Sequence, residues 1–319
     1  MRWWICLGLG WAAGCAVAAQ PAPGSAYPVK PVRWILPAQA GGANDTAARL
    51  IAPRLAEALG HTVVVDNRCG AGGNIAMEVA ARSQPDGYTI AQVSTIQAMN
   101  ASFYRRLPYD LVRDLAPVVE LISVATVIVV HPSVPARTPQ ELIAYARANP
   151  GRLNFASGTN GATGHYLKYL TGINMEVVLY KGTPPAVTEL VAGQSHVMIG
   201  TTSDLMPFAR AGKLRALALT SSTRRSPLFP DLPPLADAVP GFENPIWYGI
   251  AVPARTPAPI VRRLHAEFTH AVQNAEIRQR LAGMGYEVTA GSSEQFGERI
   301  RNEVAKWPKV VEAMGGPLN

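Results

Sequence analysis

Cysteine is scarce in this sequence, with three residues among 319. Cys6 and Cys15 lie in an N-terminal segment that we expect to be removed, so Cys69 would remain alone. A single thiol forms no internal disulfide, and the fold must therefore rest on its own core. Cys69 stands in a turn-like stretch with no histidine beside it, which favours an incidental free thiol over a catalytic nucleophile.

Long apolar runs are lacking except at the N-terminus. There, Arg2 precedes an apolar stretch from Trp3 to Ala13, which is followed by small residues. A basic start, a short apolar segment and an Ala-x-Ala site predict a secretory signal peptide over residues 1–19, cleaved after Ala18 or Ala19. The stretch is shorter than the ~20 residues of a membrane-spanning helix. We therefore expect an exported, periplasmic protein.

The same leader offers an alternative, because Ala13-Gly14-Cys15 resembles the end of a lipoprotein processing site. Such sites usually carry Leu at the preceding position, where this chain has Ala12. Cleavage of the leader is therefore favoured over lipid anchoring at Cys15.

Charged residues of one sign do not form long runs in this sequence. The formal net charge is +7, and the arginine pairs Arg105-Arg106 and Arg224-Arg225 are isolated. Nucleic-acid binding usually needs a basic stripe or a recognisable module, and neither is present, so we expect no nucleic-acid partner. A mild positive field favours anionic solutes. With 48% hydrophobic residues the chain can bury a large core, and its length suits two domains.

Motifs of the common enzyme classes are also missing. Neither Gly-x-Ser-x-Gly nor His-Glu-x-x-His occurs, and no Cys/His cluster has the spacing of metal ligands. Gly70-Ala-Gly72 lacks the third glycine or alanine of a dinucleotide fingerprint, because Ile75 occupies that position. We expect no catalytic residue, no metal, no cofactor and no enzymatic activity. A periplasmic hydrolase is the disfavoured alternative.

What the sequence does contain is an alternation of strand, loop and helix patterns, which predicts an α/β fold with largely parallel sheets. Apolar residues at a 3.6-residue period predict helices at 46–59 and, after Pro139, through Ala148. Asp45 is the expected N-cap of the first helix. Strands are expected at 32–36, 62–65, 88–93, 121–130, 154–157, 177–179, 197–200 and 214–219.

Three of the loops between these strands and helices are rich in glycine or in small polar residues: 40–45, 70–74 and 157–165. Glycine lets backbone N–H groups approach a ligand, and a helix N-terminus favours negative charge. Ligands of open α/β sheets bind beyond the carboxyl ends of the strands. Anion binding is therefore favoured over simple tight turns. For the third loop the alternative is a self-capped Ser/Thr turn.

Several motifs closely resemble the Bug family of extracytoplasmic receptors, the substrate-binding proteins of tripartite tricarboxylate transporters. They follow one another from Tyr27 to the C-terminus: Tyr27-Pro-x-Lys-Pro-Val-Arg33, Pro37-x-x-Ala-Gly-Gly42 with Asp45, Val65-Asp-Asn-Arg-x-Gly-Ala-Gly-Gly73, Pro85-Asp-Gly-Tyr88, Leu107-Pro-Tyr-Asp110, Tyr180-Lys-Gly182 with Pro185-Ala186, Gly212-Lys-Leu-Arg215 and Trp247-Tyr-Gly-Ile250.

This resemblance implies a type II periplasmic-binding-protein fold, with a first lobe at 27–124 plus 249–319, a second lobe at 125–248 and a ligand cleft between them. It implies a small carboxylate ligand held largely by backbone amides and hydroxyls. The residues it assigns to the ligand are, in the first lobe, Ala40, Gly41, Gly42, Asp45, Ser94 and Thr95, and in the second lobe Ser157, Thr159, Asn160, Thr163, His165 and Lys181. Asp204 borders the expected cleft and joins this set.

The chain departs from the family pattern at several places. Cys69 stands where Pro is frequent, Thr163 where Ser is frequent and Glu189 where Asp is frequent, and His196 lies in Gln194-Ser-His-Val197 where Gly-Gln-Val-Asp is usual. The identity of the carboxylate therefore stays open. The expected partner is either the membrane subunits of a tripartite transporter or the outer domain of a sensor, since both would use the same cleft.

Overall fold

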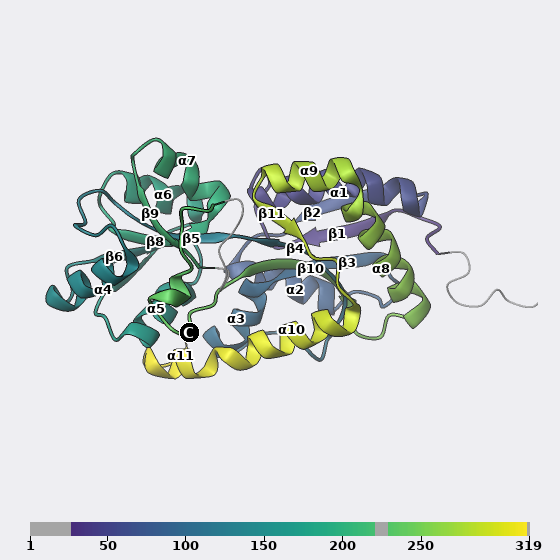
Figure 1. The fold of residues 1–319 in the computed structure, drawn as a ribbon. Coiled ribbons are helices and arrows are strands. Elements are labelled where there is room, and N and C mark those ends of the chain that lie inside the picture. The colour runs from purple at the N-terminus through teal and green to yellow at the C-terminus, as the bar shows by residue number, and fades with distance from the viewer. Residues whose placement is uncertain (1–26, 221–228, 318–319) are drawn as a thin grey trace, which may run out of the picture.

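The computed structural model describes residues 27–220 and 229–317, and it shows two lobes side by side, each with its own sheet (Figure 1). The expected leader at 1–19, with Cys6 and Cys15, lies outside the described residues. Within the described ranges, none of the helices combines the length and the apolar content that crossing a bilayer requires.

The first lobe is built on a six-stranded sheet with the order β11-β4-β10-β3-β1-β2. Residues alternate along β1: Trp34 and Leu36 pack with α1 and α8, while Ile35 packs on the other face with α2 and α10. The elements are β1 (Val32–Leu36), β2 (Val63–Asn67), β3 (Thr89–Ser94), β4 (Leu115–Val124), β10 (Ile246–Pro253), β11 (Tyr286–Val288), α1 (Ala43–Leu59), α2 (Asn74–Ala81), α3 (Thr95–Phe103), α8 (Ala258–Gln273), α9 (Ala275–Gly283) and α10 (Ser293–Lys306).

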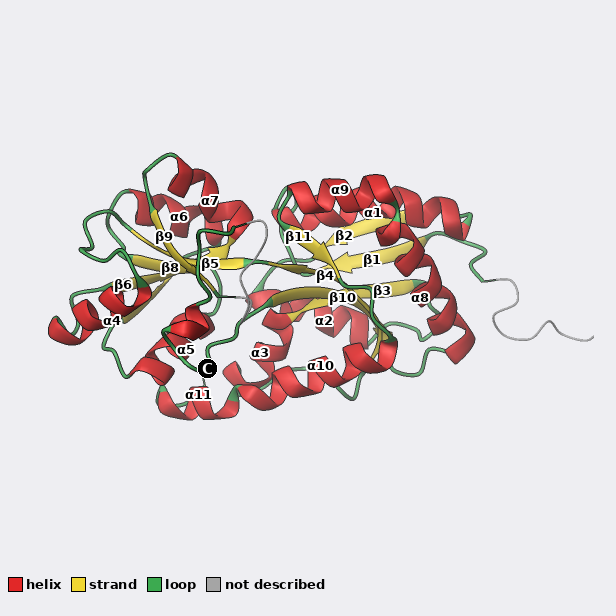
Figure 2. Cartoon of the chain, in the orientation of Figure 1, coloured by secondary structure: helices red, strands yellow, loops and turns green. Residues whose placement is uncertain are grey.

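The second lobe is built on a five-stranded sheet with the order β7-β6-β8-β5-β9. Its two faces are covered by α4 with α5 and by α6 with α7, again through alternating apolar residues (Figure 2). The elements are β5 (Thr126–Val130), β6 (Asn154–Ser157), β7 (Glu176–Leu179), β8 (Val197–Thr201), β9 (Arg215–Leu219), α4 (Pro139–Ala148), α5 (Ala162–Thr171), α6 (Thr183–Val191) and α7 (Thr202–Arg210).

The expectation of largely parallel sheets is wrong. Four of the nine strand pairings in the described residues are parallel, and the other five involve β10, β5 or β11. The apolar run 121–130, expected as one strand, is divided at Ala125 into β4 and β5, which belong to different sheets. β5 and β10 lie beside the connections between the lobes, and each runs antiparallel to both of its neighbours.

The two lobes share apolar contacts on one side of the junction. Trp307 follows α10 and lies between Phe103 of α3 and Tyr166 of α5, with ring centroids 5.9 and 5.3 Å away. The last helix, α11 (Pro308–Ala313), buries Val310 and Val311 in the same cluster as the α4 and α5 side chains. This end of the chain thus packs against both lobes, and the division of the lobes at 124/125 and 248/249 stays a prediction.

Candidate functional site

The strand directions bring the predicted site loops together at the junction of the lobes. β1 and β3 are parallel and end at Leu36 and Ser94, on the edge of the first sheet where β4 passes into β5. β6 and β8 are parallel and end at Ser157 and Thr201, on the edge of the second sheet where β5 begins. The loops after these strands therefore face one another across the junction (Figure 1).

In the first lobe, Asp45 stabilises the exposed loop 40–42 by accepting a hydrogen bond from its backbone. The Gly41 N–H donates to Asp45 Oδ2 at 2.8 Å, and Arg49 Nε and Asn67 Nδ2 donate to the same carboxylate at 2.9 and 3.0 Å. Asp45 is 2% exposed. Burial alone would raise the pKa of Asp45, but the hydrogen bonds from Arg49, Gly41 and Asn67 lower it below its ordinary value.

Asp45 is therefore a support for the loop, and its expected role as helix N-cap is wrong because α1 begins at Ala43 after Gly42. Ala40, Gly41 and Gly42 are exposed and leave their backbone accessible. Of the predicted residues in this loop, these three present surface toward the junction.

Ser94 and Thr95 are buried, and their hydroxyl groups are already paired. Ser94 Oγ accepts from the Ile96 N–H and donates to Gln97 Oε1 in a capping box. Thr95 Oγ1 donates to the Pro245 carbonyl at 3.0 Å and accepts from the Trp247 N–H at 3.1 Å. Both side chains thus hold the start of α3 and of β10 in place. Ser94-x-x-Gln97 is the local pattern of a capping box, whereas the contacts of Thr95 follow no local pattern.

The loop 157–161 of the second lobe is largely self-capped. Ser157 Oγ accepts from the N–H groups of Thr159 and Gly161 at 3.3 and 3.2 Å. Asn160 Oδ1 accepts from the Ala162 N–H, and its Nδ2 donates to Asn100 Oδ1 of the first lobe at 3.1 Å. Ser157 and Asn160 are buried, so the alternative weighed from the sequence describes this part of the loop well.

The first turn of α5 carries two half-buried candidates. Thr163 Oγ1 accepts a hydrogen bond of 3.1 Å from Asn244 Nδ2. His165 lies two residues further on, and burial, together with the charge of Lys168, lowers its pKa. His165 is therefore favoured in its neutral form, in which the imidazole offers one donor and one acceptor.

Lys181 and Asp204 lie at the ends of two further strands. Lys181 is exposed one residue before Gly182, the N-cap of α6. Asp204 lies in the first turn of α7, where its Oδ2 accepts from Thr201 Oγ1 at 2.7 Å. Burial raises the pKa of Tyr248 in β10, and the nearby charge of Asp204 raises it further, which places Asp204 at the junction.

The helix N-termini at the junction fall into two kinds. Thr201 caps α7 and Ser94 caps α3 with their own side chains. The N-caps of α1, α5 and α6 are Gly42, Gly161 and Gly182, which have no side chain to offer. Backbone N–H groups at such ends are donors that favour an anion. The arrangement suits a carboxylate between the two lobes.

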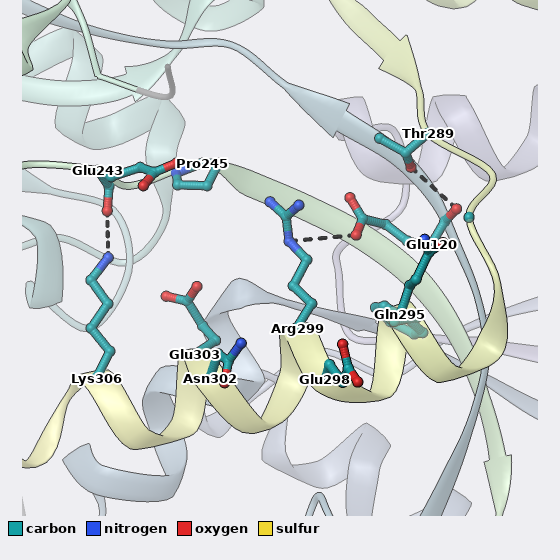
Figure 3. A pocket seen from close by; sticks show the side chains of 12 residues that line it. Glu120, Glu243, Pro245, Thr289, Gln295, Glu298, Arg299, Asn302, Glu303 and Lys306 are labelled. Carbon is teal, nitrogen blue, oxygen red and sulfur yellow. Dashed lines mark hydrogen bonds and ion pairs between the residues drawn. The ribbon is translucent and has the colours of Figure 1, made fainter. Parts of the chain in front are cut away.

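A pocket of about 600 Å³ lies elsewhere, beside α10 and the connection into β10 (Figure 3). Its charged groups are largely used within the protein. Arg299 Nε lies 3.4 Å from Glu120 Oε2, Glu303 Oε1 accepts from Trp307 Nε1, and the Lys306 ammonium donates to the Glu243 carbonyl. In the described part of the chain, no group of three or more His, Cys, Asp or Glu side chains could hold a metal ion.

Comparison with known proteins gives a consistent picture. The family model described as tripartite tricarboxylate transporter family receptor matches residues 47–316. Protein BugT of Bordetella pertussis is 33% identical over 94% of this chain and 94% of its own length. A solved R. palustris structure with adipate is 33% identical, covers 92% of this chain and 100% of its own, and has a TM-score of 0.82.

The structure of MatC from Rhodopseudomonas palustris with bound malate is 29% identical, covers 89% of this chain and 99% of its own, and has a TM-score of 0.80. The expected α/β architecture of two lobes, in the manner of periplasmic binding proteins, is confirmed by these neighbours together with the two sheets.

Proposed function

This chain belongs to the tripartite tricarboxylate transporter receptor family, and from that membership we propose that it captures a small carboxylate between its lobes and delivers it to the membrane subunits of such a transporter. The family consists of solute receptors, and the neighbours with adipate and malate carry dicarboxylates. We further propose that the chain is exported by a leader at residues 1–19, works in the periplasm and catalyses no reaction.

The proposal is supported by three helices with glycine N-caps that follow the strand ends on the two sides of the junction. Gly42 is the N-cap of α1 in the first lobe, and Gly161 and Gly182 are the N-caps of α5 and α6 in the second. A dicarboxylate has two groups that need donors, and donors stand on both sides of the junction. Backbone N–H groups bind carboxylates well because the hydrogen bond is charge-assisted and the helix dipole adds to it.

We assign direct contacts to the accessible groups. These are the backbone of Ala40 and Gly42, the Thr163 hydroxyl, His165 and the Lys181 ammonium, while the Gly41 N–H stays with Asp45. The buried residues Asp45, Ser94, Thr95, Ser157 and Asn160 are assigned to support, because their polar atoms hold these loops. Asp204 and Thr159 stay candidates at the rim. Because the ligand would contact both lobes, its binding would stabilise the form in which the lobes are closed over it.

The proposal is tested by titrating the mature protein with malate, adipate, succinate, citrate, aromatic acids and amino acids. At 100 times its Kd, a ligand adds about 2.7 kcal/mol of apparent stability. A rise in melting temperature with at least one carboxylate, which is recovered unchanged by mass spectrometry, is the expected result. No shift across the panel would overturn the ligand class, and a converted ligand would overturn the receptor role.

Delivery to a transporter is a separate claim and needs its own experiment. The ligand-loaded receptor should co-purify with the membrane subunits of a tripartite transporter expressed from the same cells. Recovery of a sensor ectodomain in place of those subunits would contradict it. The intact mass of the periplasmic product checks the leader, since a diacylglyceryl adduct on Cys15 would contradict cleavage after Ala18 or Ala19.

A further inference from the structure

Asn244 lies at the point where the chain leaves the second lobe, two residues before β10. Its N–H donates to the Thr220 carbonyl at 3.0 Å, and its carbonyl accepts from Thr126 Oγ1 at 3.2 Å. Asn244 is 1% exposed. Thr220 follows β9 and Thr126 begins β5, so the backbone of Asn244 is fixed against both strands next to the junction.

The side chain of Asn244 reaches the first turn of α5. Its Nδ2 donates to Thr163 Oγ1 at 3.1 Å, while its Oδ1 is buried without a partner among the described residues. The reverse orientation of the amide would make Oδ1 the acceptor for Thr163 and would leave both hydrogens of the buried NH₂ group without an acceptor. Either orientation leaves one polar atom of the amide unpaired, and the structure has Nδ2 as the donor to Thr163.

A hydroxyl that receives a hydrogen bond on its oxygen still has one hydrogen to donate. Several helical threonines of this chain give it to the carbonyl four residues earlier, as Thr46 does to Gly42 and Thr171 does to Leu167. Thr163 makes no such bond in the described residues. Its i−4 residue, Thr159, lies in the loop before α5 rather than in the helix. The hydrogen of Thr163 is thus left for a group outside the helix.

We propose that Asn244 is a positioning residue: by donating to Thr163 Oγ1, it turns the Thr163 hydroxyl into a fixed donor for a ligand carboxylate at the N-terminus of α5. This inference rests on the proposed function and adds a residue and a selection rule to it. The ligand atom next to Thr163 must be an acceptor, so a carboxylate oxygen fits there and an ammonium group does not.

A double-mutant cycle tests this coupling. The mature protein, Asn244→Leu, Thr163→Val and the double variant are titrated by calorimetry with malate, adipate and citrate. Thr163→Val removes the donor, and we expect a loss of roughly tenfold to a hundredfold, the range for a hydrogen bond to a charged group. Asn244→Leu leaves the hydroxyl unaligned and should cost roughly threefold to tenfold. The double variant should lose no more than Thr163→Val alone.

Two further variants keep the test decisive. Thr163→Ser retains the hydroxyl and should retain both the affinity and the effect of Asn244→Leu. Asn244→Asp has the shape of the native side chain but accepts instead of donating, so it covers the case in which Asn244→Leu does not fold. The loss of affinity caused by Asn244→Asp should be smaller when Thr163→Val is also present, because only the repulsion between the Asp carboxylate and the ligand carboxylate then remains.

Losses that add in the double variant, or an unchanged affinity in Asn244→Leu, overturn the inference while leaving the proposed function intact. Failure of the unsubstituted protein to bind any carboxylate overturns the proposed function and the inference with it. The melting temperature of each ligand-free variant shows whether a loss arises from unfolding.

Discussion

Asn100 Oδ1 accepts a hydrogen bond of 3.1 Å from Asn160 Nδ2, which joins α3 of the first lobe to the β6–α5 loop of the second. The Nδ2 group of Asn100 donates to Asn74 Oδ1 and to the Gly72 carbonyl at 2.8 and 3.0 Å. One fully buried side chain therefore connects the loops 70–74 and 157–165. It lies on the same side of the junction as Trp307, so we expect this side to stay closed while the lobes move.

Asn100→Ala should lower the free energy of unfolding by about 2–4 kcal/mol. The substitution removes three hydrogen bonds, each worth roughly 0.5–1.5 kcal/mol, and leaves Asn160 Nδ2 without a partner, whereas Asn74 Oδ1 keeps Tyr109 and the Gly72 carbonyl keeps Gln97. Urea denaturation measures the change. Asn302→Ala, an exposed asparagine on α10, is the control and should change stability by less than about 0.5 kcal/mol. Equal stability of the two variants would contradict a structural role for the Asn100–Asn160 bond.

Asp45→Ala should weaken carboxylate binding roughly tenfold, because the Gly41 N–H loses the acceptor that holds the loop 40–42. Calorimetry with the carboxylate that stabilises the unsubstituted protein measures the loss. Glu57→Ala removes an exposed ion pair on the same helix and should leave affinity unchanged. A normal affinity in Asp45→Ala would show that the loop keeps its shape without this anchor.

The stability of Asp45→Ala also depends on pH in a defined direction. The folded-state pKa of Asp45 lies below its unfolded value of about 3.9. Its contribution to stability is therefore present above that unfolded value and is lost as the pH falls through the folded-state pKa. The gap in melting temperature between Asp45→Ala and the unsubstituted protein should shrink in acid. A gap that stays constant down to pH 3 would contradict the pairing.

The fold could be read from the sequence where local patterns decide it. The strand 32–36 follows from its local run of apolar residues, and the glycines mark the loops that lead into α1 and α5. The direction of β5 and β10 could not be read in this way. The apolar run 121–130 fits one long strand as well as two, and only the pairing of Thr126 with Thr201 in another sheet divides it.

The loops of the candidate site could be named from the sequence, but the partners of their side chains could not. Ser94, Thr95 and Asn160 are polar residues at the right strand ends, yet their partners are buried protein groups. A single sequence does not show which polar groups meet across 60 to 150 residues of chain. For the same reason the sequence does not point to Asn244, since its contact with Thr163 spans 81 positions and follows no local motif.

Glu120→Gln should raise the melting temperature at neutral pH by roughly 2–4 °C, about 1 kcal/mol for a protein of this size. Glu120 is 7% exposed, and burial raises its pKa more than the charge of Arg299 lowers it. The folded protein therefore favours the protonated carboxyl more than the unfolded chain does. The contribution of Glu120 to the stability of the fold is present below its unfolded pKa of about 4.3 and is lost as the pH rises through the folded-state pKa. Arg299 is partly exposed and can be solvated when its partner becomes neutral.

Thermal melts of Glu120→Gln from pH 4 to pH 8 check this expectation. The two proteins should converge at the acid end and separate above the folded-state pKa. Glu298→Gln, at an exposed position of α10 next to Arg299, should follow the unsubstituted protein throughout. A lower melting temperature for Glu120→Gln at pH 8 would show that the ion pair with Arg299 stabilises the fold by more than the burial costs.

Gly42→Ala gives the most direct test of the ligand position. Gly42 has φ −73°, which any residue adopts, and a Cβ there would meet the Gln39 carbonyl at 3.4 Å, an ordinary contact. The free protein therefore has no reason to lose stability, and a restricted unfolded chain would even add about 0.4–1 kcal/mol. If a carboxylate approaches the backbone at this N-terminus, the added methyl group should cost affinity by tenfold or more.

Gly283→Ala is the matched control, because a Cβ there meets nothing within 4 Å and the residue ends α9, outside the loops that follow β1, β6 and β7. Gly41→Ala is less informative, since Gly41 has φ +81° and a side chain there strains the loop by about 1–2 kcal/mol whether or not a ligand binds. Calorimetric affinity is measured beside the melting temperature of each ligand-free protein. Weaker binding in Gly42→Ala alone, at an unchanged melting temperature, places the carboxylate against the start of α1. Equal affinity in Gly42→Ala and Gly283→Ala removes this loop from the site and leaves the donors of α5 and α6 to hold the ligand.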